Sequence, residues 1–293
     1  MNGAVIWLAS YPKSGNTWMR VLLTNYVQDG ETPVSVNELS GGPIASARQL
    51  LDDNVGIEGS DLTQDEIERL RPYVYERISD RIVEEGSPRP VFLKVHDAYT
   101  RTSEGVPLIP KRATAGVVYL LRDPRDVAVS YAHHAGIGVG EAVDALGNPN
   151  HAFFDRASTI NEQLRQRLST WSGHVASWTT EPGLRVLTVR YEDLLADTGA
   201  ALAAVVRFSG LDVDADRIAK AVEFSRFEEL RAQESAEGFQ ERQPKAPMFF
   251  RQGSSGTWRS VLSPEHVAKL EGDHAEAMER FGYSTQPEGR MTP

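Results

Sequence analysis

Residues Val5–Tyr26, VIWLASYPKSGNTWMRVLLTNY, decide how the rest of the chain is interpreted. The stretch opens with a short apolar run, Val5–Ala9, of the kind that forms a buried strand. A turn that carries a proline and a glycine follows at Ser10–Asn16. Thr17–Tyr26 then repeats apolar and aromatic residues at helical spacing. The order strand, tight loop, helix predicts a site where backbone N–H groups and the positive end of a helix face one anion.

The composition of the loop decides between two interpretations of this stretch. Lysine, serine, glycine, asparagine and threonine stand consecutively at Lys13–Thr17. An ordinary strand–helix connection with a surface lysine would account for any one of them, but their combination favours a phosphate or sulfate site. The spacing differs from the nucleotide-triphosphate loop G-x-x-x-x-G-K-[ST], because Lys13 stands two positions before Gly15 instead of directly after a glycine.

Length and composition bound the possible functions. A chain of 293 residues with 40% hydrophobic and 25% charged residues is expected to form one α/β domain over residues 1–293, with a frayed tail at 283–293. The net charge of −10 argues against a nucleic-acid partner, so an anion site must be a local basic pocket. The absence of cysteine excludes disulfides and thiolate chemistry. Without an apolar run long enough to span a bilayer or a basic, hydrophobic N-terminus, we expect a cytoplasmic protein. Only 6 of the 31 basic residues are lysines, which favours a GC-rich bacterial source.

Three further apolar runs predict strands, at Pro90–Lys94, Gly116–Leu121 and Leu184–Val189. Open α/β sheets bind ligands at the carboxyl ends of their strands. Lys94 and His96 follow one strand and point to the same side of it. A single histidine in such a place is more often structural than catalytic, so spacing alone does not assign its role.

The segment after the third strand predicts a helix start and something more. Asp123 suits a cap, Pro124 the first turn and Asp126 the positive end of the helix. These roles do not explain Arg122 at the end of the strand or Ser130 two helical turns further on.

Two segments between the predicted strands have distinct patterns. Thr63–Glu85 has a capping signal, Thr63 with Glu66, and Pro72 is expected to kink or split the helix. The glycine-rich stretch 135–150 is expected to be a mobile lid over the site.

Four motifs of this chain resemble those of the PAPS-dependent sulfotransferases of the cytosolic type. These enzymes move a sulfuryl group from 3′-phosphoadenosine 5′-phosphosulfate (PAPS) to an alcohol, phenol or amine. YPKSGNTW at 11–18 differs at one position from the family loop YPKSGTTW, and K-V-H at 94–96 matches the family K-x-H. RDPRDVAVS at 122–130 and FFRQGSSGTW at 249–258 resemble the two segments that hold the donor's 3′-phosphate. The motifs occur in the family's order over about residues 5–260.

The resemblance implies a fold and a set of roles. The fold is a central parallel β-sheet flanked by helices, of the P-loop nucleotide-kinase-like type. His96 is expected to be the catalytic base of an in-line displacement, Lys13 to stabilise the leaving phosphate and Lys94 to assist, with no metal. The residues expected to bind PAPS are Lys13, Ser14, Gly15, Asn16, Thr17, Trp18, Arg122, Ser130, Tyr191, Ser225, Phe227, Leu230, Phe249, Phe250, Arg251, Gln252 and Gly253.

The last motif departs from the family at two positions. Gln252 replaces a lysine, which removes one cation from the phosphate site, and Thr257 replaces an aspartate. We expect Arg122, Ser130 and Arg251 still to hold the 3′-phosphate.

The acceptor and the alternatives stay open at this point. The acceptor pocket is expected from segments 29–90, 131–160 and 231–249, and favours a small molecule, a lipid or a natural product. The oligomeric state is not determined by the sequence. A nucleotide-kinase-like phosphotransferase shares the implied fold, and a PAPS-binding protein without catalysis shares the implied ligand. The presence of both Lys13 and His96 counts against the second alternative, since binding alone does not use the histidine.

Overall fold

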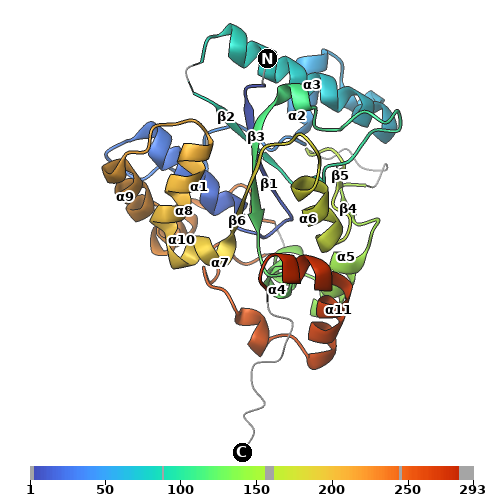
Figure 1. Ribbon diagram of the computed structural model, residues 1–293, viewed down its shortest axis with the longest axis vertical. Helices are drawn as coiled ribbons and strands as arrows, with labels where there is room; N and C mark the ends of the chain where they lie inside the picture. Colours follow the sequence, from blue (N-terminus) through green and yellow to red (C-terminus); the bar gives the residue numbers. More distant parts are fainter. Residues whose placement is uncertain (1–2, 88, 156–161, 244–245, 284–293) are drawn as a thin grey trace, which may run out of the picture.

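The computed structural model describes residues 3–87, 89–155, 162–243 and 246–283 (Figure 1). Within them, four parallel strands form the central sheet, in the order β2 (Val91–Val95), β1 (Val5–Ser10), β3 (Thr114–Leu121) and β6 (Val186–Arg190). All the strands expected from the sequence are present, and the predicted fold class is confirmed.

Both faces of the sheet are covered, as the apolar character of β1 requires. All six residues of β1 are buried. Trp7 joins the core on one face, and Ile6 and Leu8 join the core on the other, because side chains alternate along a strand. Figure 1 shows α1, α8 and α9 on one side of the sheet and α5, α6 and α11 on the other. Four helices build the core on the second face of the sheet, the face that includes Ile6 and Leu8. They are α1 (Asn16–Gln28), α7 (Tyr191–Ala196), α8 (Thr198–Phe208) and α9 (Ala215–Phe224).

The first face, which includes Trp7, is covered by helices that come from several parts of the chain. They are α2 (Arg48–Val55), α3 (Gln64–Glu84), α4 (Pro124–Ala135), α5 (Val139–Gly147), α6 (Trp171–Thr179) and α11 (Pro264–Arg280). A separate helix, α10 (Phe227–Glu237), packs against α1 through a third, smaller apolar cluster. β4 (Ala152–Phe153) and β5 (Gln166–Arg167) form a short antiparallel pair.

The structure adds detail to three sequence expectations. Pro72 lies inside α3 without splitting it, and the helix is held by apolar residues buried on both sides of the proline, among them Ile67 and Val74. The glycine-rich stretch contains the helix α5, whose Leu146 is fully buried, so part of this stretch belongs to the core. Tyr283, the first residue of the expected frayed tail, is buried and donates a hydrogen bond to Glu192; residues 284–293 lie outside the described residues.

The parallel arrangement brings the carboxyl ends of the four strands to one edge. The segments that follow β1, β2, β3 and β6 begin with Tyr11, His96, Arg122 and Tyr191. Most of the motif residues are on these segments or in the first turns of α1 and α4. The fold therefore gathers residues that are far apart in the sequence at the edge where such sheets bind ligands.

Candidate active site

The loop between β1 and α1 adopts backbone conformations that few residues accept. Gly15 has φ 95°, and a Cβ there would fall 2.7 Å from a ring carbon of Tyr191, so a glycine is needed for both reasons. Lys13 has φ 72°, a left-handed conformation that is costly for a lysine and that concentrates at functional sites. The Asn16 side chain donates to the carbonyl of Leu8 at 2.8 Å and ties the loop to the strand.

Unpaired polar groups mark this loop as a binding site for an anion. No side chain caps the start of α1, so its first N–H groups face the loop without a side-chain acceptor. In the described part of the chain, Ser14 Oγ and Arg122 Nε are buried without a hydrogen-bond partner. Buried polar groups are normally paired, and these donors beside a helix N-terminus fit a phosphate-bearing ligand.

His96 is held in one tautomer by the end of β1. Its Nδ1 is 2.9 Å from the carbonyl oxygen of Ser10 and 3.3 Å from the Ser10 hydroxyl. Since a carbonyl oxygen only accepts, Nδ1 carries the proton and Nε2 keeps its lone pair. Burial, assisted by the charge of Lys94, lowers the pKa of His96 well below its usual 6.5. The imidazole is therefore neutral at physiological pH, with the free lone pair at Nε2.

A second buried histidine supports the backbone of His96. His174 Nε2 donates to the His96 carbonyl at 3.0 Å, and His174 Nδ1 accepts from the Tyr119 hydroxyl at 2.8 Å. Burial lowers the pKa of His174 to about 4, which keeps this ring neutral and suited to donate with one nitrogen and accept with the other. β3 and α6 thus fix the position of the residue after β2.

Two lysines face the same region with unusual surroundings. Lys13 Nζ lies 3.9 Å from the centre of the Phe249 ring, and burial together with the charges of Lys94 and Arg122 lowers the pKa of Lys13 to about 7. Lys94 Nζ is 2.7 Å from a carboxylate oxygen of Glu241. The lysines expected from the sequence are therefore close enough to influence each other's titration.

Sequence reasoning missed the partners of Lys94. Glu241 also forms an ion pair with Arg20 of α1, whose side chain is only 7% exposed. Glu241 lies in a polar segment without a motif, and Arg20 lies within an apolar helical pattern. The one signal available was the arginine itself, because a charge on a buried helix face needs a partner.

Arg122 links three parts of the site. Its guanidinium donates to the carbonyl of Lys13 at 3.2 Å and to the carbonyl of Ser254 at 2.9 Å, and it stacks 4.2 Å from the centre of the Tyr191 ring. The strand-end arginine thus joins the loop after β1 to the glycine-rich turn (residues 251–258).

The glycine-rich turn is fastened to α4 by Asp126. This buried carboxylate accepts hydrogen bonds from the backbone N–H groups of Gly256 at 2.6 Å and Trp258 at 3.0 Å, and from the Thr257 hydroxyl at 3.0 Å. Sequence reasoning assigns Asp126 only a role at the positive end of the helix and leaves the departure at Thr257 without a structural reason. The threonine contributes one of the three bonds that hold the turn.

Aromatic side chains form a wall beside the loop. Trp18 meets Tyr191 edge to face at 5.9 Å, and its indole N–H donates to the Ser225 carbonyl at 3.0 Å. Phe227 lies so close to Gly253 that a Cβ there would be 2.5 Å from its ring. Trp18, Tyr191, Phe227 and Gly253, all predicted to bind PAPS, therefore border neighbouring parts of one region.

Other predicted residues have different surroundings. The Ser225 hydroxyl accepts from Asn25 inside the protein instead of facing the site. Leu230 and Phe250 are buried in the apolar cluster that packs α10 on α1. Three residues of the expected phosphate clamp lie nearer the surface: Ser130 and Arg251 are half-buried, and Gln252 is exposed.

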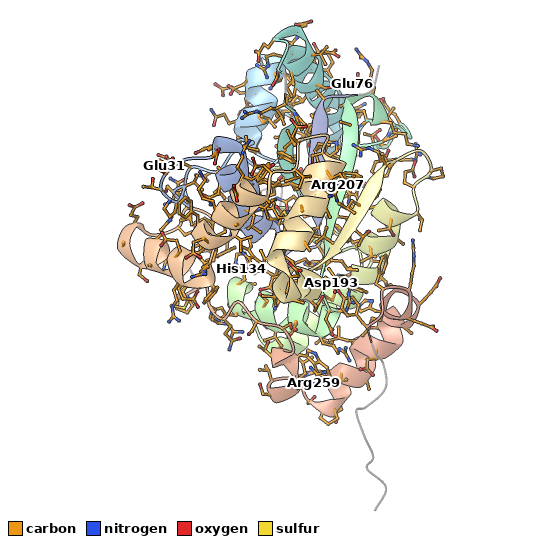
Figure 2. All side chains as sticks on the ribbon, turned by 60° about the vertical axis from the view of Figure 1, so that its left-hand side comes forward. Glu31, Glu76, His134, Asp193, Arg207 and Arg259 are labelled. Atoms are coloured by element: carbon orange, nitrogen blue, oxygen red, sulfur yellow. The ribbon has the colours of Figure 1, made fainter. Side chains whose placement is uncertain are left out.

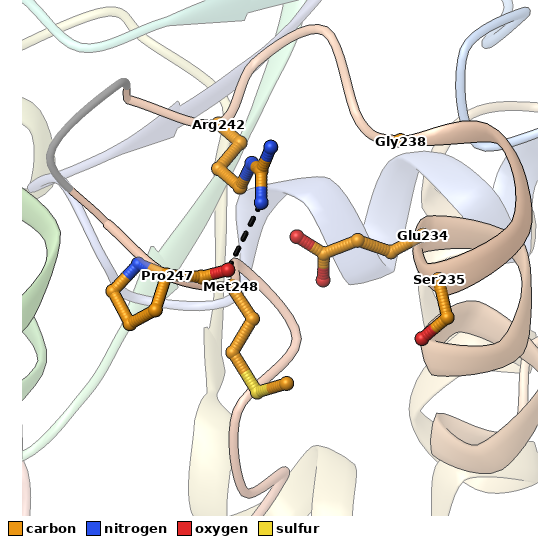
Figure 3. Close-up of a pocket in the computed structure, with 6 residues that line it drawn as sticks. All are labelled: Glu234, Ser235, Gly238, Arg242, Pro247 and Met248. Atoms are coloured by element: carbon orange, nitrogen blue, oxygen red, sulfur yellow. Dashed lines mark hydrogen bonds between the residues drawn. The ribbon is translucent and has the colours of Figure 1, made fainter.

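Residues 238–243 and 246–250, called the covering segment below, follow α10 and lie next to the site. With α10 this segment encloses a cavity of about 300 Å³, shown in Figure 3. The Arg242 guanidinium crosses the cavity to donate to the Pro247 carbonyl at 2.9 Å. The Glu234 carboxylate accepts from the backbone N–H groups of Phe249 and Phe250. All six lining residues come from α10 and the covering segment.

A further imidazole faces the lysines from α4. His134, labelled in Figure 2, has its ring 6.1 Å from the Phe249 ring. Burial is the main cause that lowers the pKa of His134 to about 3, and the charges of Lys13 and Lys94 add to it.

The described residues contain neither a cluster of metal-binding side chains nor a membrane-spanning helix. In the ranges that the structure describes, no three histidine, aspartate or glutamate side chains gather closely enough to hold a metal ion. None of the helices in those ranges is long and apolar enough to cross a membrane.

Fold and site together define an α/β protein with hydrogen-bond donors suited to a phosphate-bearing ligand next to a neutral imidazole. The family model for the sulfotransferase domain matches residues 4–282, so the chain belongs to the sulfotransferase family, as predicted. Cytosolic sulfotransferase 17 of Arabidopsis thaliana is 23% identical over 94% of this chain and 75% of its own length. Luciferin sulfotransferase of Photinus pyralis is 22% identical, over 96% of this chain and 74% of its own.

A solved structure has the same fold. Retinol dehydratase, crystallised in complex with androsterone and the inactive cofactor PAP, superposes with a TM-score of 0.61 at 21% identity, covering 95% of this chain and 82% of that protein. The predicted class of enzyme, a sulfotransferase, is thus confirmed at the level of the family.

Proposed function

We propose that this protein transfers a sulfuryl group from PAPS to a hydroxyl or amine of a small organic acceptor by in-line displacement. The observation that carries the proposal is the tautomer of His96. With Nδ1 bonded to the Ser10 carbonyl, the basic Nε2 is available beside Lys94 and the Lys13 loop. A protein that only bound PAPS would have no use for a neutral imidazole held in this way.

The residues of the loop suit the donor's 5′ end. Ser14 Oγ and the N–H groups at the start of α1 would bond to the phosphate that is bridged to the sulfuryl group. Trp18, Tyr191 and Phe227 form an apolar wall of the kind on which an adenine stacks. Arg122, with its unpaired buried Nε, and Arg251 of the glycine-rich turn are our candidates for the 3′-phosphate.

The transfer balances with this chain's own groups. The acceptor oxygen forms a bond to sulfur while the bond from sulfur to the bridging phosphate oxygen breaks. His96 Nε2 takes the acceptor's hydroxyl proton, and the electron pair of the broken bond leaves on the phosphate of 3′,5′-adenosine bisphosphate (PAP). Lys13, fixed over the loop, stabilises the charge that grows on that phosphate.

The acceptor site is proposed on the first face of the sheet, beyond His96. Tyr131 stacks on Phe153 with ring centroids 5.8 Å apart, and His151 bonds to both Tyr11 and Tyr131. Such a wall favours a flat or apolar small molecule. A relative named for luciferin and a structural neighbour holding androsterone support a small acceptor. We place the protein in the cytoplasm and treat residues 1–293 as one domain.

A transfer assay tests the function directly. The purified protein is incubated with PAPS labelled in its sulfate and a panel of phenols, sterols, primary alcohols and amines, and products are identified by mass. Label should appear in an organic acceptor together with stoichiometric PAP. If PAP binds but no member of the panel or cell extract is sulfated, the non-catalytic alternative replaces the proposal.

A further inference from the structure

Glu241 brings a negative charge into a group of hydrogen-bond donors. Its Oε2 is 2.7 Å from Lys94 Nζ and 3.4 Å from Thr17 Oγ1, and its Oε1 forms the ion pair with Arg20. The three donors come from β2 and from the first two turns of α1, whereas Glu241 comes from the covering segment. The contacts therefore join a partly exposed residue of the covering segment to largely buried residues of β2 and α1.

The donors that hold Glu241 are the ones an anionic substrate needs. Thr17 is in the first turn of α1, where the helix favours negative charge. Lys94 is on β2, two residues before His96. Burial opposes the charge of Glu241, but Lys94 and Arg20 outweigh it and lower the pKa of the carboxyl far below its usual range. The group is thus a permanent anion beside the start of α1, whose N–H groups are proposed to bind the phosphosulfate end of PAPS.

The covering segment is able to give up these contacts. The Glu241 side chain is 32% exposed, and the next two residues, Arg242 and Gln243, are exposed. Water can therefore solvate the carboxylate when it leaves its partners. The side chains of Lys94 and Arg20, by contrast, are 11% and 7% exposed, and Arg20 also donates to the Gly42 carbonyl at 3.4 Å.

We propose that Glu241 sets the affinity for the donor by competing with its 5′ anion for Lys94 and Thr17. Donor binding then requires the Glu241 carboxylate to withdraw, so that Lys94 exchanges its ion pair with Glu241 for one with the bound anion. The proposal rests on the proposed function, since it names PAPS as the competing anion. It predicts that removing the carboxylate strengthens donor binding, whereas a supporting residue would weaken binding when removed.

Calorimetry with PAP and with 3′-AMP tests the competition. In Glu241→Gln, PAP should bind about three- to tenfold more tightly than in the wild type, as expected when the binding-competent state rises from a minor to the major population. Affinity for 3′-AMP should not change, because this ligand lacks the 5′ anion. Glu237→Gln is the matched control: it removes one exposed carboxylate from the end of α10 and should alter neither affinity.

The outcomes separate the competition from the proposed function. Unchanged or weaker PAP binding in Glu241→Gln, with wild-type PAP binding intact, overturns the competition and leaves the proposed function standing. Equal tightening of PAP and 3′-AMP also overturns it, since a general charge effect would then suffice. If the wild type binds no PAP, the proposed function fails and the competition with it. Melting temperatures of both variants, compared with that of the wild type, show whether the fold is kept when Arg20 loses its carboxylate partner.

Discussion

The loop after β1 and the covering segment approach the same lysines but are held in different ways. Tyr11 and Ser14 of the loop are each 1% exposed, and Asn16 bonds the loop to β1. The covering segment reaches the site through Glu241, which is partly exposed, and through the ring of Phe249. The groups proposed for bond making thus lie on the buried loop and the strands beside it, called the rigid region below, and the group proposed to adjust donor affinity lies on the covering segment.

This division predicts separate effects of mutation. Changes on the rigid region should lower turnover by large factors, because a base must be within hydrogen-bond reach of the proton it takes. Changes on the covering segment and the glycine-rich turn should alter affinity by small factors.

Replacing His96 with alanine should lower turnover by ~10²–10⁴ while PAP affinity stays within about twofold. The variant removes the base but no proposed contact to the donor. Single-turnover sulfation and calorimetry on the same preparation measure the two quantities. A variant that kept near-native turnover would exclude His96 as the base and direct attention to His134. A loss of PAP binding in parallel with a lower melting temperature would instead show a structural histidine.

The pH dependence of donor binding should follow Lys13. Its pKa is lowered to about 7, mainly by burial, so above pH 7 the free protein holds this side chain largely neutral. A bound anion favours the ammonium form, so binding takes up a proton, and PAP affinity should fall by up to about tenfold per pH unit between pH 7 and 9. Calorimetry in two buffers of different ionisation enthalpy counts the protons. Lys13→Arg, which stays charged, should remove the dependence; a slope that survived in this variant would assign it to another group.

The sequence predicted the rigid region better than the covering segment, for a physical reason. Val5–Ala9 and the residues after it are fixed by local rules: an apolar strand, a glycine with positive φ and a helix start. The order of the strands brought Lys94 and His96 to the loop in the structure, as expected for parallel strands. Glu241 depends on where a polar segment returns in three dimensions, and no periodicity encodes that return.

The same limit explains the remaining differences. The position of Asp126 in the first turn of a helix already explains an aspartate there. The sequence therefore does not predict its bonds to the glycine-rich turn. Ser225 and Phe250 match a family motif in outline, yet the Ser225 hydroxyl bonds to Asn25 and Phe250 packs on α1. Motif spacing places a residue near a site but does not orient its side chain.

Asp126→Asn tests whether the glycine-rich turn contributes to affinity through its anchor. An amide keeps the size of the side chain but weakens the charge-assisted bonds from Gly256 and Trp258. PAP affinity should fall about three- to fivefold, or about 1 kcal/mol, while 5′-AMP affinity is unchanged because 5′-AMP lacks the 3′-phosphate. Equal losses for both nucleotides would indicate a general loosening of the fold instead of a displaced clamp.

The smallest effect is expected from restoring the family's lysine in the glycine-rich turn. Gln252 is exposed, so a lysine fits there without repacking. If the 3′-phosphate binds between Arg122 and Arg251, Gln252→Lys adds one more cation near it, at a position exposed to solvent. Charges in such positions contribute only ~0.2–1 kcal/mol, so PAP should bind about two- to threefold more tightly in low salt, with the gain lost in high salt.

The matched control is Ser255→Lys, which adds the same charge at an exposed position of the same turn. If both lysines tighten PAP equally, the gain reflects overall charge and residue 252 does not border the 3′-phosphate. A marked loss of affinity in Gln252→Lys alone would show that the turn presents this residue to something other than a phosphate.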